Sequence, residues 1–77
     1  MSFQAYINAV ETKTGMPIAD LTAIARNKGF VNADGKVASG IKAGDVVAWL
    51  KSDYGLGHGH AMSVWALFSG KRKAGDA

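Results

Sequence analysis

Apolar side chains recur at helical spacing in four stretches of the sequence. Positions i, i+3, i+4 and i+7 are apolar in the first and last of them, which is one face of an amphipathic helix. The inward positions are Phe3, Tyr6, Ile7 and Val10, then Leu21, Ile24 and Ala25, then Val46, Val47, Leu50 and Tyr54, and finally Ala61, Val64, Trp65 and Phe68. This pattern predicts an all-α fold in which four short helices, over residues 2–14, 17–28, 43–54 and 58–68, surround one core.

Residues that favour helix ends bound these stretches. The side-chain oxygen of Ser2 can cap the first helix, and Pro17 suits the first turn of the second, where a missing N–H costs nothing. Glycine most readily adopts the left-handed conformation that follows a helix. We therefore expect the four helices to be ended by Gly15, Gly29, Gly55 and Gly70.

The helical pattern is interrupted over residues 31–44. The Asn, Asp, Ser and Gly residues at 32–35 and 39–40 are typical of turns. We expect an ordered loop that is pinned to the core by Phe30, Val37 and Ile41. The alternative is a small hairpin between Val31 and Val37.

A chain of 77 residues can form one domain. We expect this domain to comprise residues 1–70, followed by a frayed basic tail, residues 71–77. The absence of cysteine excludes a disulfide framework and a thiolate metal site, and it favours a reducing cytoplasm. No apolar run approaches the roughly 18 residues that span a bilayer, so no membrane association is expected, and residues 1–4 show no signal-peptide pattern. The formal net charge of +3 favours anionic partners only slightly.

Three glycines alternate with Leu56, His58 and His60 between the last two predicted helices. Glycine has no Cβ, so a ligand can approach its backbone closely and positive φ angles are allowed. The free N–H groups and the dipole of the following helix would point at such a ligand. Histidine adds donors and, near and below pH ~6.5, positive charge. We call residues 55–60 the Gly–His turn and expect any function to lie there.

Residues 47–62, Val-Ala-Trp-Leu-Lys-Ser-Asp-Tyr-Gly-Leu-Gly-His-Gly-His-Ala-Met, resemble the signature of a bacterial family of small domains of unknown function. That signature is a tryptophan–leucine–lysine triplet, an aspartate–aromatic pair and a Gly-Leu-Gly-His-Gly-His-Ala-Met run. The resemblance extends to residues 3–6, 13–15 and 42–45 and so covers most of the chain, although the loop over residues 31–40 is longer and richer in glycine than is usual in the family. It implies an all-helical domain and assigns no activity.

A second, local similarity is to the helix-hairpin-helix motif. The glycine–hydrophobic–glycine turn of that motif, with an alanine four residues after the second glycine, matches Gly55, Leu56, Gly57 and Ala61. The motif implies that the turn and the following helix offer backbone N–H groups to a DNA phosphate. The basic residue that often follows the second glycine is replaced here by His58, Gly59 and His60.

The leading functional hypothesis is weak, sequence-independent contact with nucleic-acid phosphates. The backbone donors would come from Gly55, Gly57, His58, Gly59 and His60, and the positive charge from Lys51, Lys71, Arg72 and Lys73. In the structural alternative, the glycines only permit a close turn, Leu56 fills the core and the histidines cap the last helix. The sequence alone does not separate the two.

Other chemistry finds less support. Trp49 is either a core residue or a partly exposed one; if exposed, it would anchor a protein partner or a homo-oligomer, because tryptophan is enriched at binding hot spots. A zinc site requires at least three ligands, and only Asp53 stands near His58 and His60, so we expect no metal and no cofactor. Ser63, His60 and Asp53 suggest a nucleophilic set, but four short helices enclose little volume for a pocket, so no enzymatic activity is expected.

Overall fold

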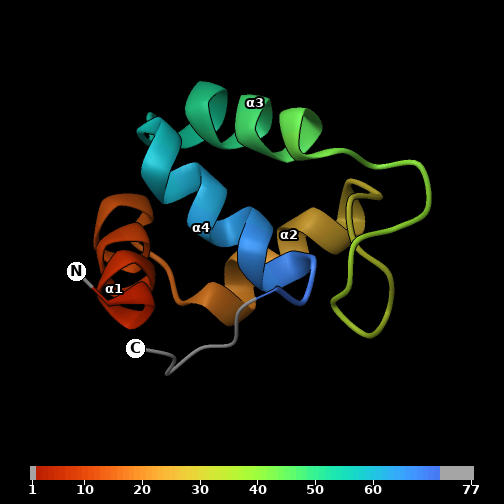
Figure 1. Ribbon diagram of the computed structural model, residues 1–77, viewed down its shortest axis with the longest axis horizontal. Coiled ribbons are helices and arrows are strands. Elements are labelled where there is room, and N and C mark those ends of the chain that lie inside the picture. Colours follow the sequence, from red (N-terminus) through yellow and green to blue (C-terminus); the bar gives the residue numbers. More distant parts are fainter. Residues whose placement is uncertain (1, 72–77) are drawn as a thin grey trace.

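Most of the chain is helical in the computed structural model, which describes residues 2–71 (Figure 1). The helices are α1 (Phe3–Thr14), α2 (Ile18–Asn27), α3 (Ala43–Tyr54) and α4 (His58–Phe68). Within the described residues no strand forms, and the predicted all-α fold is confirmed. A bilayer crossing would need a longer apolar helix than any that residues 2–71 form.

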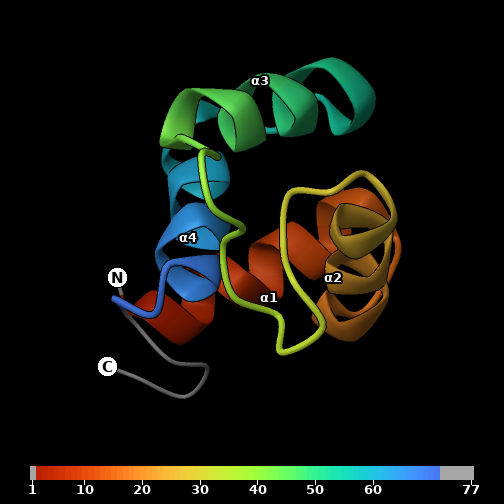
Figure 2. The ribbon, with the colours of Figure 1, turned by 90° about the vertical axis from the view of Figure 1, so that its right-hand side faces the viewer.

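Helix α4 is the central element of the fold. It packs against both α3 and α1, and α1 packs in turn against α2. Figure 2 shows α3 lying across one end of the molecule, with α4 and α2 on opposite sides below it. The corner between α3 and α4, which contains the Gly–His turn, therefore lies at the edge of the fold (Figure 1).

The core is formed by apolar side chains from all four helices, the loop after α2 and the Gly–His turn. Its buried members are Val10, Leu21, Ala25, Val31, Val46, Val47, Trp49, Leu50, Leu56, Ala61, Val64 and Phe68. Each large apolar side chain that is removed from water adds about 1.5–3 kcal/mol to stability. Most predicted inward positions are buried, whereas Tyr6, Ile24, Tyr54 and Trp65 are only partly so.

The predicted helix ends are largely confirmed. Ser2 caps α1, because its Oγ accepts a hydrogen bond from the N–H of Ala5 at 3.2 Å. The expected glycines Gly15, Gly29, Gly55 and Gly70 all have positive φ angles. A residue with a Cβ is strained in that conformation, so these four positions stop the helices where the sequence predicts.

The start of α2 differs from the prediction. Pro17 lies just before the helix and not in its first turn, because its ψ of 155° is extended. Its carbonyl accepts hydrogen bonds from Asp20 and Leu21 at 3.0 and 3.2 Å. The N–H of Ile18 donates instead to Oε2 of Glu11, on α1, at 2.7 Å. A side chain of the neighbouring helix therefore caps α2.

The segment between α2 and α3 is an ordered loop, as favoured from the sequence. Val31 and Val37 form one isolated antiparallel bridge, so the alternative hairpin is reduced to a single pair. The side-chain oxygen of Asn32 accepts hydrogen bonds from the N–H groups of Asp34 and Lys36, which closes the turn. Phe30, Val37 and Ile41 pack partly buried against the core and hold the loop down.

Candidate functional site

The Gly–His turn changes direction at its first residue. Gly55 has a φ of 66° and donates its N–H to the carbonyl of Lys51 at 3.1 Å, which ends α3. Leu56 is buried in the core, as the structural alternative requires. Gly57 has a φ of −69° and a ψ of 163°, which is ordinary extended backbone. Glycine allows positive φ at both positions, but Gly55 alone of the two adopts it, because a single left-handed residue already turns the chain out of α3.

Helix α4 begins without a cap. Gly57 occupies the N-cap position and has no side chain that could accept a hydrogen bond, and no acidic residue occupies the first turn of α4. The carbonyl of Gly57 accepts the N–H of Ala61 at 3.0 Å, but no described residue accepts a hydrogen bond from the N–H groups of His58, Gly59 or His60. The backbone is also uncovered, since Gly57, His58 and Gly59 are exposed. These donors thus belong to residues that are exposed or, at His60, partly exposed.

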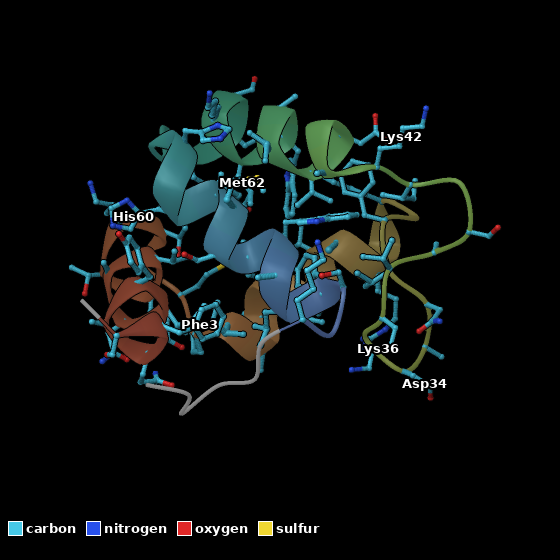
Figure 3. The ribbon with its side chains drawn as sticks, in the orientation of Figure 1. Phe3, Asp34, Lys36, Lys42, His60 and Met62 are labelled. Carbon is cyan, nitrogen blue, oxygen red and sulfur yellow. The ribbon has the colours of Figure 1, made fainter. Side chains whose placement is uncertain are left out.

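The two histidines have different surroundings. His58 is exposed, whereas His60 is partly buried and lies edge-on to Tyr6 of α1, with ring centroids 5.5 Å apart (Figure 3). Neither imidazole hydrogen-bonds the start of α4, so the suggestion that they cap this helix is wrong. The packing of α1 against α4 brings Tyr6 to the site; no local sequence signal predicts that contact, because the two residues are far apart in the chain.

The predicted basic residues do not gather at the turn. Lys51 is exposed in the last turn of α3, one turn from Gly55. Lys71 follows the other end of α4, about 16 Å along the helix from the turn, so it lies apart from the turn and its contact with phosphate stays a prediction. Arg72 and Lys73 lie outside the described residues.

Trp49 is buried, with only 6% of its surface exposed. Its ring lies 5.5 Å from that of Phe30 and 5.9 Å from that of Tyr54. Helix α3 is covered both by α4 and by the residues that follow α2, so its buried face is wide enough to include position 49. The hypothesis of an exposed Trp49 that anchors a partner is therefore wrong.

The side chains considered for metal or nucleophilic chemistry have other partners in the structure. Within residues 2–71, no three His, Cys, Asp or Glu side chains lie close enough to hold a metal ion. The hydroxyl of Ser63 is nearly buried and donates to the carbonyl of Gly59 at 2.9 Å, which is a contact within α4. Asp53 pairs with Lys28, with Nζ and Oδ2 3.9 Å apart. The Ser63, His60 and Asp53 set therefore does not assemble.

Comparison with known proteins gives one match. The model of the family described as "Domain of unknown function (DUF4287)" matches residues 2–70. Neither the curated proteins nor the solved structures yield a match. The similarity of the turn to the helix-hairpin-helix motif stays a prediction. Because the family match spans nearly the whole chain and all four helices, this protein belongs to the DUF4287 family of domains of unknown function.

Proposed function

We propose that the start of α4 binds the phosphate groups of nucleic acid without sequence preference. The observation that carries this proposal is the row of N–H groups at His58, Gly59 and His60, which are exposed or partly exposed and have no acceptor among the described residues. An anion at this position would accept hydrogen bonds from donors that otherwise bind only water. It would also meet the positive end of the α4 dipole.

The glycines make room for such an anion. A Cβ built at Gly57 would lie 3.9 Å from Nδ1 of His60, and one at Gly59 would lie 3.8 Å from Cε1 of Tyr6. Both distances are ordinary contacts, so glycine is not required there by crowding inside the fold. Its absence of a side chain instead leaves the outer surface of the backbone bare, which supports contact with a ligand as large as a nucleic-acid strand.

The local charge supports weak binding. Lys51 adds one exposed cation near the turn, and the carboxylate of Asp53 is partly offset by Lys28. The chain as a whole carries a formal charge of +3. With one such cation, the site would neutralise about one phosphate. The proposed role is one of binding without catalysis, and the absence of cysteine, with the resemblance to bacterial domains, favours the cytoplasm as its setting.

Fluorescence anisotropy with a labelled DNA duplex tests this function. Binding should be measurable near 50 mM salt and should weaken roughly 3- to 4-fold near 200 mM, as expected when one phosphate is neutralised. A duplex of unrelated sequence should bind equally well. Absence of binding at the lower salt concentration would refute the proposal.

Two variants at one position isolate the backbone donor. His58 occupies the first position of α4, where proline is tolerated, and His58→Pro removes both the imidazole and the N–H. His58→Ala removes the imidazole alone. We expect His58→Pro to bind DNA about tenfold more weakly than His58→Ala, because a hydrogen bond to a charged group is lost. Ala43→Pro, at the first position of α3, is the matched control and should bind as the wild type does.

A further inference from the structure

The side chain of Lys28, which follows α2, reaches the C-terminal half of α3. Its Nζ lies 6.0 Å from the centroid of the Trp49 ring and 3.9 Å from Oδ2 of Asp53. Trp49 and Asp53 are four residues apart and so share one face of α3. The ammonium group is thus held between an indole ring and a carboxylate.

Two further rings surround the indole. Phe30 is tilted by 52° against Trp49 with ring centroids 5.5 Å apart, and Tyr54 meets it edge-on at 77° and 5.9 Å. Both rings are only partly buried. Phe30 and Tyr54 pack against the indole, and the indole is the ring that lies within cation–π distance of Lys28 Nζ. An aromatic ring beside a carboxylate is a combination that attracts organic cations. We call Lys28, Phe30, Trp49, Asp53 and Tyr54 the ammonium corner.

The end of α3 adds a third attraction for positive charge. Asp53 lies in the last turn of α3, where the carbonyl groups already carry partial negative charge. An acidic side chain at this end of a helix is unfavourable unless a cation lies nearby. Lys28 is that cation, so the ammonium corner attracts positive charge through an indole ring, a carboxylate and a helix end.

Lys28 occupies this corner loosely. Its distances to the ring and to the carboxylate are both at the outer limits of such contacts. Its side chain is 41% exposed and that of Asp53 is 47% exposed. Beneath it, Trp49 is buried and its Nε1 has no hydrogen-bond partner among the described residues. An internal cation with these contacts can be displaced by another cation that fits the rings more closely.

We propose that the ammonium corner binds a quaternary ammonium group, and that Lys28 is its internal substitute, which swings outward when the ligand enters. A quaternary ammonium ion suits the corner better than a lysine does, because a lysine ammonium is strongly hydrated and loses more on leaving water. The proposal is independent of phosphate binding, since it concerns ligands of the opposite charge and residues outside the Gly–His turn.

Nuclear magnetic resonance of the indole N–H tests this site directly. The probe is choline, and its control is 3,3-dimethyl-1-butanol, which has the same shape without the charge. The Trp49 signal is assigned by its retention in Trp65→Phe. Choline should shift this signal in a saturable manner and the neutral alcohol should not. No shift with choline, or an equal shift with both compounds, would overturn the proposal.

Three variants identify the residues responsible. Lys28→Ala empties the corner and should tighten choline binding roughly 2- to 30-fold, the range of a cation–π contact. Asp53→Asn should weaken it by a similar factor. Lys42→Ala removes an exposed lysine at the opposite end of α3 and should change nothing (Figure 3). Unchanged or weaker binding by Lys28→Ala, with circular dichroism like that of the wild type, would overturn the role of Lys28 as internal occupant.

A peptide that carries trimethyl-lysine distinguishes two sources of the ligand. Binding tighter than that of choline would support a protein side chain as the natural source of the ammonium group. Binding weaker than that of choline would support a free small molecule. If neither choline nor the peptide shifts the Trp49 signal, no quaternary ammonium site exists at this corner.

Discussion

At the start of α2, the carboxylate of Glu11 accepts a hydrogen bond from Ile18 at 2.7 Å, whereas at the start of α4 no described residue accepts one from His58, Gly59 or His60. The two starts face the same local problem. Each is preceded by a residue, Pro17 or Gly57, whose side chain cannot cap a helix. The neighbouring helix α1 supplies a carboxylate to α2.

Toward α4, the same helix presents Tyr6, whose ring contacts His60 and leaves the backbone donors free. If stability alone mattered, a hydrogen-bond acceptor would be favoured at the starts of both α2 and α4, because helix starts with unsatisfied N–H groups are less stable. The start of α2 is therefore closed within the fold, whereas the start of α4 has no acceptor among the described residues, and this is where we propose that phosphate binds. Mutations at the two starts can strengthen or break this contrast.

The largest effect is expected at the residue that sets the direction of α4. Gly55→Val places a β-branched side chain at a φ of 66° and should lower the free energy of unfolding by about 1–3 kcal/mol. Urea denaturation measures the loss. Gly57→Ser, two residues later at a φ of −69°, is the control and should not destabilise the protein. Equal losses in both variants would contradict the assignment of the left-handed residue.

The second largest loss of stability is expected when the hydrogen bond by which Glu11 of α1 caps α2 is removed. Glu11→Ala removes the acceptor for the N–H of Ile18 and should cost about 1–2 kcal/mol of stability, because the hydrogen bond involves a charged group and is partly buried. Glu11→Gln keeps an oxygen in place and should lose less. Thermal unfolding followed by circular dichroism compares the two. If both variants unfold at the wild-type temperature, the Glu11 hydrogen bond does not stabilise α2, and the starts of α2 and α4 do not differ in the way described.

A capping side chain at the start of α4 should raise the stability of the protein and at the same time lower its affinity for DNA. Gly57→Asp supplies the missing cap and should raise the free energy of unfolding by a few tenths of a kcal/mol. The added carboxylate would occupy and repel the anion position, so DNA affinity should fall at least about tenfold. Urea denaturation and fluorescence anisotropy on the same samples measure both. A variant that is more stable and binds DNA as well as the wild type would place the phosphate contact elsewhere.

The smallest effect is expected for the exposed histidine. His58→Ala should change the free energy of unfolding by less than about 0.5 kcal/mol, because the side chain faces solvent. His60→Ala removes the edge contact with Tyr6 and should cost about 0.5–1.5 kcal/mol. Urea denaturation of both variants decides. A larger loss for His58 than for His60 would reverse the assignment of the exposed and packed rings.

The four helices could be predicted because their signals are local. The bounds of α3 and α4 agree with the predicted residues 43–54 and 58–68, since apolar spacing and a helix-ending glycine act within a few residues. The exposure of Gly57 and Gly59 in the Gly–His turn was likewise expected from local sequence, because glycine has no side chain to cover the backbone. What could not be predicted are contacts between residues far apart in the chain.

Two such contacts changed the description of the molecule. The cap of α2 by Glu11 depends on how α1 and α2 cross, and burial of Trp49 depends on where the residues after α2 lie over α3. Lys71 was assigned by its charge; the length of α4 separates it from the turn, and its contact with phosphate stays a prediction. The extended conformation of Gly57 could not be derived from the sequence, since glycine permits positive φ without requiring it.

The hydrogen bond from the N–H of Val37 to the carbonyl of Phe68, at 3.1 Å, joins the middle of the loop to the last residue of α4. Amide exchange of Val37 with heavy water therefore cannot proceed by motion of the loop tip alone; it requires release from the helix that forms the centre of the protein. Val37 should exchange more slowly than loop residues such as Ala33 and Ser39, whose N–H groups donate to no described residue.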